Sequence, residues 1–392
     1  MKKRYIWQKR WLRRHSIFSD RRRLRFEAAA AARRQGTRRL KVFIETQQGR
    51  RQAWAANRTP MPENFCLESN YDECIERLRK LRLSLNQSAR QMRRYSGAGQ
   101  NKRARVASFL DFSTIKRCTP ATALVLAAEY DRARSLLPSG GIRLINLDNW
   151  RIDLVEMLDE IGFFDLLQIP RPQTSSEKRS DISVVRFQTG STFGNTEAGS
   201  LMKTLATMIV TADHADALDD PTTLAARLRL YSALVEACEN ARRHAYPAAA
   251  AVDPAVRRWW MTGAVHQAEK RLTLVVYDQG VTIPASLPGW LGYSWIERAL
   301  RLLSLAPLQE GDPSRDGLIL RLAMNSPRSS TGLDHRGKGF PAFKQVIKEC
   351  ERGKLRIVSR HGEFIYEKGR RPFGRQLESP LEGTLVEWDL WL

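Results

Sequence analysis

A carboxylate and a carboxamide lie one helical turn apart in the segment LVEACENARRHAY, as Glu236 and Asn240. The Asn side chain offers a neutral oxygen to a hard cation such as Mg²⁺, which proteins commonly hold through few side chains together with phosphates and water. The Glu side chain can orient or deprotonate a nucleophile. The spacing therefore predicts metal-assisted phosphate chemistry, and a partly exposed polar stripe on a helix is the alternative.

The segment around this pair predicts an amphipathic helix. Pro221 stands at the first helical position, where proline fits best, and Pro247 marks the end after Tyr246. Apolar residues recur between them at three- and four-residue spacing, namely Leu224, Leu228, Tyr231, Val235 and Cys238. Glu236 and Asn240 therefore belong to one slowly turning stripe at the edge of the buried face.

A second candidate is Asp278, which ends the apolar run LTLVVYD two residues before Gly280. The run is rich in Leu and Val and predicts a buried strand. A carboxylate at a strand end can accept a hydrogen bond from an exocyclic amine, and glycine lets the backbone pass close to a flat ring. The spacing indicates recognition of a nucleobase, with an Asp that only caps the next turn as the alternative.

A glycine pair, Gly337 and Gly339, precedes the helical stretch PAFKQVIKECERG. Glycines that lead into a helix let backbone N–H groups approach phosphate oxygens, and the helix N-terminus adds a partial positive charge. Arg336 and Lys338 can add charge-assisted contacts. The pattern indicates a phosphate-binding loop, and an ordinary flexible loop is the alternative.

Two strands are expected to close the chain, at 354–359 (KLRIVS) and at 384–390 (TLVEWDL), the second opened by Gly383 and Thr384. The four motifs in this order resemble the nucleotide-binding (Bergerat) fold of the GHKL family, which includes gyrase-type and heat-shock-chaperone ATPases, histidine kinases and anti-sigma-factor serine kinases. The resemblance implies a two-layer α/β sandwich over 181–392 that binds ATP and Mg²⁺.

The resemblance also implies a role for each matching residue. Glu236 would be the catalytic base, Asn240 the Mg²⁺ ligand and Asp278 the reader of the adenine amino group, with Thr384 bonding nearby. Thr282 departs from the family pattern, which has a second Gly there, so its Cβ predicts a shifted loop or a tighter pocket. The expected nucleotide-binding residues are Asn240, Asp278, Gly280, Thr282, Arg336, Gly337, Lys338, Gly339, Phe340 and Thr384, and those from 336 to 340 belong to a candidate lid.

Positive charge is concentrated near the N-terminus. Residues 1–50 hold 17 Lys and Arg against 3 Asp and Glu, and residues 51–105 hold 12 against 5, so these segments carry +21 of the net +23. Such a block is typical of polyanion binding, and WQKRWLRRHSIFSDRRRLRF interleaves aromatic and basic side chains. Alanines in FEAAAAARRQGTRR favour a helix. We expect a basic, helical arm over 1–61.

This arm is expected to bind RNA or DNA, with a solvated tail or a patch for an acidic protein as the alternatives. The residues expected to contact nucleic acid are Lys2, Lys3, Arg4, Trp7, Lys9, Arg10, Trp11, Arg13, Arg14, Arg21, Arg22, Arg23 and Arg25.

Strand and helix patterns alternate between the arm and the ATP-binding segment. Strands are expected at PENFCLESN, at 106–112 and at 142–147, and helices at DECIERLRKLRLSL, PATALVLAAEYDRARSLL and RIDLVEMLDEIGFFDLL. The pattern over 62–169 resembles a STAS-like α/β domain, the fold of anti-anti-sigma factors. PRPQTSSEKRS, at 170–180, is expected to be a linker.

The STAS-like resemblance bears on phosphorylation. In anti-anti-sigma factors an acceptor serine stands at the start of the helix that matches PATALVL, and here that position holds Ala121. The resemblance therefore implies no phosphorylation at that position, with Thr119 or Thr122 as substitutes.

Composition argues against several classes of protein. No apolar run approaches the ~18 to 20 residues that span a bilayer, and the N-terminus lacks the apolar core of a signal peptide. The cysteines are odd in number, scattered and without C-x-x-C spacing, which argues against a disulfide framework and a zinc site. We expect a cytoplasmic protein.

The combined resemblance is to uncharacterised bacterial or mobile-element ATP-binding proteins. ATP binding or hydrolysis would act as a conformational switch, coupled to nucleic acid through the arm and to a protein partner through the STAS-like domain. Two alternatives stay open: a serine/threonine protein kinase of the anti-sigma type, and a non-catalytic nucleic-acid-binding scaffold. The sequence also leaves open whether the chain forms a homodimer.

Overall fold

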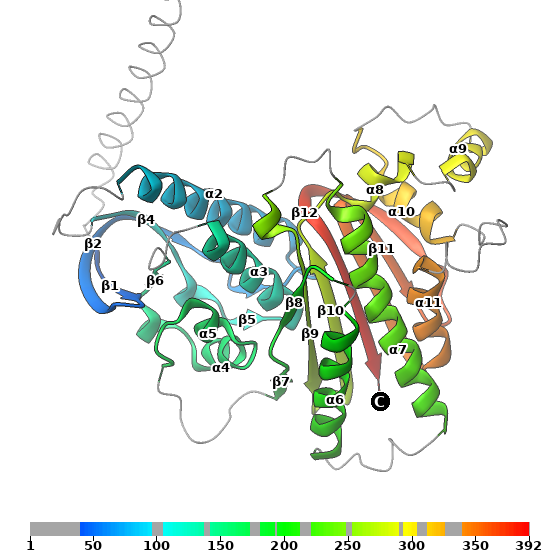
Figure 1. Cartoon of the computed structure of the whole chain (residues 1–392), viewed down its shortest axis with the longest axis horizontal. Coiled ribbons are helices and arrows are strands. Elements are labelled where there is room, and N and C mark those ends of the chain that lie inside the picture. The colour runs from blue at the N-terminus through cyan, green and yellow to red at the C-terminus, as the bar shows by residue number, and fades with distance from the viewer. Residues whose placement is uncertain are drawn as a thin grey trace, which may run out of the picture.

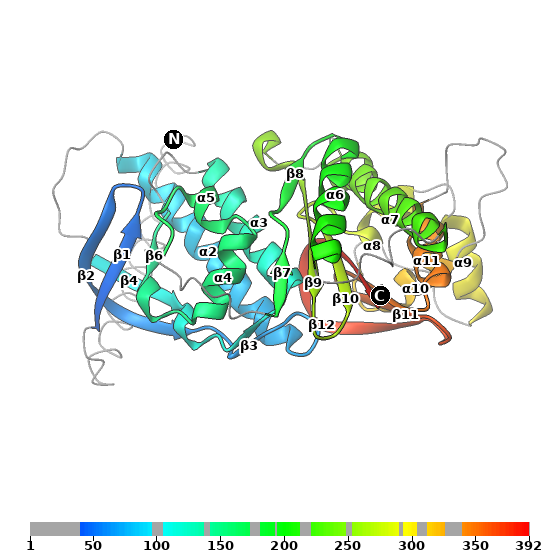
Figure 2. The same ribbon diagram turned by 90° about the horizontal axis from the view of Figure 1, so that it is seen from below.

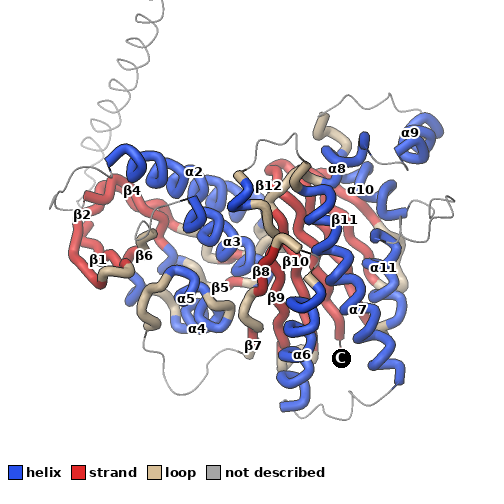
Figure 3. Tube along the Cα trace, viewed as in Figure 1, coloured by secondary structure: helices blue, strands red, loops and turns tan. Residues whose placement is uncertain are grey.

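The computed structural model describes residues 40–95, 105–136, 142–172, 181–192, 194–211, 221–247, 253–289, 293–303, 312–325 and 339–391. Helices and sheets both contribute, which confirms the α/β class (Figure 3). All the nucleic-acid contacts expected between Lys2 and Arg25 lie outside the described residues.

We use the name N-terminal module for residues 40–172. Its elements are β1 (Leu40–Thr46), β2 (Gly49–Pro60), β3 (Asn64–Phe65), α2 (Tyr71–Tyr95), β4 (Arg105–Asp111), β5 (Arg117–Cys118), α3 (Pro120–Leu136), β6 (Leu144–Ile145), α4 (Ile152–Glu160) and α5 (Phe163–Leu167).

The C-terminal module comprises residues 181–391. Its elements are β7 (Ile182–Val184), β8 (Gln188–Gly190), α6 (Asn195–Thr211), α7 (Pro221–Asn240), β9 (Trp259–His266), β10 (Arg271–Asp278), α8 (Ile283–Ser286), α9 (Tyr293–Leu302), α10 (Asp316–Asn325), α11 (Gly339–Glu349), β11 (Arg352–Glu367) and β12 (Phe373–Trp391).

An antiparallel sheet in the order β11-β12-β10-β9-β7 forms the centre of the molecule, with β8 also pairing β9. The helices α6, α7 and α11 cover one face (Figure 1). The other face packs against the N-terminal module, so the sheet stands between two layers (Figure 2). In β10, Leu274 and Val276 point to the helices, whereas Val275 and Tyr277 point to the N-terminal module. Burial on both faces explains why this strand is a continuous apolar run.

The N-terminal module has a curved sheet in the order β4-β2-β1-β6 and the helices α2 to α5. Helix α3 is buried from Pro120 to Asp131 because other elements surround it, including α2, α5 and the large sheet. A buried hydrogen bond also joins the modules: Arg356 of β11, which is paired with Glu363 and Glu387, donates to the carbonyl of Leu67.

Several predicted boundaries change. Residues 40–60, expected as part of a helical arm, form the hairpin β1–β2, in which Val42 and Ile44 alternate with exposed or half-buried residues. The helix expected over 151–167 breaks at Gly162, whose φ of 91° is open mainly to glycine. The last strand begins at Phe373, ahead of Gly383 and Thr384.

The expected helix that carries Glu236 and Asn240 is confirmed from Pro221, and a π-helical turn over Ala241–Ala245 completes it before Pro247. Its buried stripe is shifted from the predicted one, because Leu228 is exposed while alanines such as Ala233 and Ala237 face the core. Short side chains let the helix lie close to the sheet.

Candidate functional site

Three polar residues stand side by side where three neighbouring strands are paired. Asp278 of β10 is opposite Thr384 of β12, which is opposite Ser359 of β11. Directly opposed residues on neighbouring strands point to the same face. That face is the helix-covered one, because Val276, two residues before Asp278, belongs to the helix-side core. The sequence therefore places its two candidates, Asp278 and Thr384, correctly together.

Sequence reasoning missed Ser359, the third member of this row. Its Oγ lies 2.8 Å from Thr384 Oγ1 and accepts a hydrogen bond from the backbone N–H of Ile283 at 2.9 Å. Ser359 is fully buried. The available signal was its position at the end of the predicted strand KLRIVS, but only the strand register shows that it faces Thr384.

Asp278 is 7% exposed, and its Oδ1 accepts the Gly280 N–H at 2.9 Å. Burial disfavours the ionised form and raises the pKa of Asp278 to about 7, while the Gly280 hydrogen bond acts in the opposite direction. The carboxyl group can consequently change its protonation state near neutral pH, and a ligand that donates a hydrogen bond to it would favour the ionised form.

The turn after Asp278 is fastened to the end of α7. The Val281 N–H donates to the carbonyl of Ala245 at 2.6 Å, and a Cβ on Gly280 would lie 2.1 Å from the same carbonyl oxygen. In the structure, therefore, Gly280 allows close approach to protein backbone, whereas the sequence suggested approach to a flat ring. Thr282 is 8% exposed, and its Oγ1 is buried without a hydrogen-bond partner.

Replacing Gly280 with Ala should lower the Tm by several degrees and lower the affinity for any ligand bound by this turn. The reason is that the added Cβ overlaps the backbone of Ala245, which cannot rotate away as a side chain can. Thermal unfolding of the purified chain checks this. Gly199→Ala is the matched control: it lies in α6 with only Tyr231 near its Cβ position, and Ala favours helices, so its Tm should stay equal or rise. An equal Tm for the Gly280 and Gly199 variants would contradict the assigned packing.

Glu236 and Asn240 lie half-buried on the side of α7 that faces α11. Arg229 of α7 pairs with Glu349 of α11 at 3.4 Å. Arg229 precedes Glu236 by seven residues and Asn240 by eleven, and at 3.6 residues per turn both fall within about 20° of its direction. The expected pair is thus confirmed to share one helix face, and that face is directed to α11.

The beginning of α11 lies towards the same end of the sheet as Asn240 and Asp278. Helix α11 ends at Glu349 beside the early part of α7, and the two helices lie side by side (Figure 1). From Glu349 back to Gly339 is ~15 Å, and from Arg229 to Asn240 is ~16.5 Å, at 1.5 Å per residue. Helix α11 begins at Gly339, two residues before the expected start at Pro341, so Gly339 and Phe340 belong to its first turn. Arg336, Gly337 and Lys338 lie outside the described residues.

Phe340 has a structural contact that the sequence did not predict. Its ring lies 6.3 Å from that of Phe343 at 76°, and Phe343 packs edge-on against Trp388. These contacts hold the start of α11 on the sheet. Phe343 therefore attaches α11 to β12, and Phe340, three residues earlier in the same helix, packs against Phe343 and the helix-side core.

Gln279, between Asp278 and Gly280, bonds to both modules. Its backbone N–H donates to Tyr246 Oη at 3.1 Å, and its Nε2 donates to Glu129 of α3 at 2.9 Å. Arg82 of α2 bonds to Glu129 through Nε at 2.8 Å. The loop that carries Asp278 is consequently tied to two helices of the N-terminal module.

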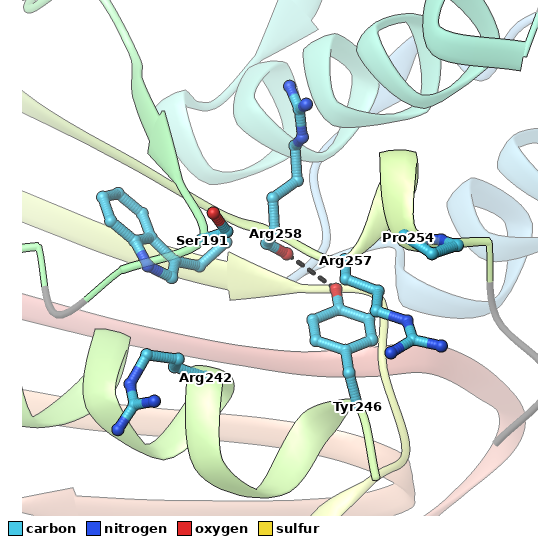
Figure 4. A pocket seen from close by; sticks show the side chains of 7 residues that line it. Ser191, Arg242, Tyr246, Pro254, Arg257 and Arg258 are labelled. Atoms are coloured by element: carbon cyan, nitrogen blue, oxygen red, sulfur yellow. Dashed lines mark hydrogen bonds between the residues drawn. The ribbon is translucent and has the colours of Figure 1, made fainter. Parts of the chain in front are cut away.

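A cavity of about 300 Å³ lies beside Tyr246. Its lining residues are Ser191, Arg242, Tyr246, Pro254, Arg257, Arg258 and Trp259. Tyr246 Oη donates to the Arg258 carbonyl at 2.6 Å (Figure 4). The Arg258 side chain points away from Tyr246 towards α3, where it pairs with Asp131 at 3.1 Å. Arg242 is two residues after Asn240, so the cavity lies behind α7 relative to the Asn240 face.

The threonines weighed as phosphoacceptors have different surroundings. Thr122 is fully buried and accepts the Leu67 N–H at 3.1 Å, so its hydroxyl is inaccessible to another protein. Thr119 is half-buried and bonds to Thr122 at 2.9 Å.

Within the described ranges, no helix combines the length and apolar character needed to cross a bilayer, and no three His, Cys, Asp or Glu side chains are placed to hold a metal ion together. All five cysteines are described, and each is a free thiol. No protein-family model and no curated protein sequence matches the chain.

Proposed function

We propose that the C-terminal module is a GHKL-class α/β sandwich that binds Mg-ATP, and that ATP binding or hydrolysis works as a conformational switch. The observation that carries the proposal is the row of Asp278, Thr384 and Ser359 on the helix-covered face, at the end of the sheet towards which Asn240 and Gly339 lie. This arrangement brings a base-reading carboxylate, a cation ligand and a helix N-terminus to one end of the sandwich.

The residues fit the nucleotide in a further respect. The Thr282 hydroxyl is buried and lacks a partner, which ordinarily costs stability unless a ligand or water completes it. It stands four residues after Asp278, so a bound adenine could supply that partner. Asp278 would accept a hydrogen bond from the adenine amino group, and Asn240 would hold Mg²⁺ together with the phosphates.

Glu236 would act one helical turn from the metal ligand. Bound ATP supplies the phosphoryl group that is transferred. A carboxylate on the same helix face as Asn240 can orient a water or accept its proton, and the resulting reaction is slow hydrolysis. The N-terminus of α11 would favour negative charge on the phosphates.

The switch would pass through Gln279. Closure of the Asp278 turn on adenine moves the residue that bonds Glu129 of α3, and Glu129 is held in turn by Arg82 of α2. The STAS-like N-terminal module and the basic segment that precedes it would then sense nucleotide. Phosphorylation within α3 is not part of this proposal, because Ala121 lacks a hydroxyl and Thr122 is buried.

One assay separates the classes of function. Purified protein is incubated with ATP labelled on the γ-phosphate, with and without RNA or DNA, and both phosphate release and transfer of label to protein are measured. Release without transfer supports the switch. Transfer to an added partner protein would replace it with the serine/threonine kinase, and the absence of ATP binding in equilibrium dialysis would leave only the scaffold.

Replacing Gln279 with Ala should uncouple the modules. We expect ATP affinity to change less than about threefold, since the lost hydrogen bond to Glu129 is worth roughly 0.5 to 1.5 kcal/mol and lies away from the base. Hydrogen exchange in α3 should respond to ATP in the wild type and not in the variant. Gln188→Ala, which removes a half-buried side chain from β8, is the control. A preserved response in the Gln279 variant would rule out this route.

A further inference from the structure

The outward face of the β1–β2 hairpin presents aromatic and basic side chains together. Val42, Ile44, Ala53 and Ala55 point inward to a small core. The alternate positions therefore point outward, and Lys41 is directly opposite Trp54, with Phe43 opposite Gln52 on the next outward pair. Trp54 is 53% exposed, which is unusual for the largest apolar side chain.

Cations lie over the second aromatic ring. Lys41 Nζ is 5.6 Å and Arg50 Cζ is 4.5 Å from the centre of the Phe43 ring. Arg50 is also paired with Glu45 at 3.2 Å and with Asp148, which holds its guanidinium in place beside Phe43. Phe43 and Trp54 are diagonal neighbours across the hairpin, about 7 to 8 Å apart between backbone positions.

Charge indicates what this face attracts. The hairpin follows residues 1–39, which hold 15 Lys and Arg, and lies within the first 105 residues that carry +21 of the net +23. A polyanion drawn to this segment would meet the hairpin next. An exposed ring at Trp54 and a half-buried ring at Phe43, both beside cations, suit unpaired bases linked by phosphates, because aromatic side chains stack only on bases that a duplex does not hide.

We propose that the Lys41–Phe43–Trp54 face of the β1–β2 hairpin is a stacking platform for single-stranded RNA. Trp54 takes one base. The half-buried Phe43 takes the next base when the cations over its ring, Lys41 and Arg50, turn to the phosphates. RNA is the occupant because unpaired bases are standing features of RNA, whereas DNA exposes them only transiently. The inference rests on the expectation that the basic N-terminal segment binds nucleic acid, and it is independent of the nucleotide site.

The test uses the full chain and a fluorescent 12-nucleotide RNA of mixed sequence, with affinity measured by anisotropy at several salt concentrations. Trp54→Ala should weaken binding roughly 5- to 100-fold, the range for loss of one stacked base, with little change in salt dependence. Phe43→Leu, which keeps an apolar side chain but removes the ring, should act in the same direction. Lys41→Gln should instead reduce the slope of log affinity against log salt by about 0.7, as expected for one phosphate contact on a single strand.

Matched controls come from the C-terminal module. Phe373→Ala removes another exposed ring and Arg370→Gln another exposed cation, and both should leave RNA affinity within about twofold. ATP affinity, measured on the same samples, should be unchanged in every hairpin variant. If the wild type itself binds no ATP, the proposed nucleotide site is wrong, and the test of the RNA platform is unaffected.

Two results would overturn the platform. The first is equal binding of RNA by wild type and by the Trp54 and Phe43 variants, which would assign the affinity to residues 1–39. The second is an affinity for duplex RNA equal to that for the single-stranded RNA, which would exclude base stacking. An equal affinity for single-stranded DNA of the same sequence would exclude the assignment to RNA.

Discussion

Replacing Asp278 with Asn should make the nucleotide-free protein more stable. The same substitution should lower its affinity for ATP. Burial raises the pKa of Asp278 to about 7, so the folded state prefers the protonated group. That preference contributes stability below pH ~4, where the unfolded chain is protonated too, and the contribution is lost as pH rises through 7. Asn mimics the protonated form at every pH.

The gain in free energy of unfolding on replacement by Asn should therefore be small at pH 4 and largest above pH 7. Its upper limit is about 4 kcal/mol, from the difference between the pKa of Asp278 in the folded and in the unfolded chain. Urea unfolding at pH 4.5, 6 and 8 measures it. ATP affinity should fall by more than ~1 kcal/mol, because a charge-assisted hydrogen bond to the amino group becomes a neutral or mismatched one. Wild-type affinity should also decrease from pH 8 to pH 6, while that of the variant stays flat.

Two outcomes would contradict the role of Asp278. An unchanged preference for ATP over GTP in the Asn variant would show that this residue does not read the base. A variant that is destabilised at pH 8 would show that the carboxylate is held by unrecognised partners and not by a site that awaits a ligand. Asp253→Asn, at an exposed 3₁₀-helix cap, is the control for the substitution itself.

Replacing Asn240 with Ala should abolish Mg-ATP binding, whereas Glu236→Ala should leave binding largely intact and stop turnover. Loss of a Mg²⁺ ligand removes the cation that joins protein to phosphates, and loss of the base affects only the chemical step. Calorimetry with Mg-ATP and a phosphate-release assay separate the two effects. Glu239→Ala is the control on the same helix, since Glu239 pairs with Arg243 and lies outside the Asn240 face.

Full ATPase activity in the Glu236 variant would remove its catalytic assignment. Equal binding of ATP with and without Mg²⁺ in the wild type would remove that of Asn240. If the Asn240 variant binds Mg-ATP normally while the Asp278 variant does not, the nucleotide site stands and the Mg²⁺ ligand is a residue other than Asn240.

Local periodicity was sufficient to predict α7, β10, α11, β11 and β12 of the C-terminal module, whereas β7 to β9, α6 and α8 to α10 were not predicted. The helix from Pro221, the strand that ends at Asp278 and the helix that follows Gly339 each have a local signal of proline, apolar run or glycine. The α/β class followed from their alternation. Ser359 could not be recognised because its importance comes from register, which joins residues far apart in the chain.

The hairpin β1–β2 shows a different limit. Its many arginines resemble the preceding basic segment, and composition alone extended a helical arm to residue 61. The two-residue alternation of Val42, Ile44 and their neighbours was the strand signal, and charge concealed it. Gly280 and Phe340 were chosen as nucleotide-binding residues, and that role stays a prediction. Their contacts in the structure are with the Ala245 backbone and, within α11, with Phe343, and the spacing of the motifs reveals neither contact.

The sheet that is covered on both faces makes the two modules one cooperative unit. Separating the two modules would expose Trp260, Tyr277 and Leu385 to water and leave Arg356 without the Leu67 carbonyl. A domain that folds independently would instead have a polar surface on that face of the sheet. A substitution in α3 that loosens this contact should therefore lower the stability of both modules together.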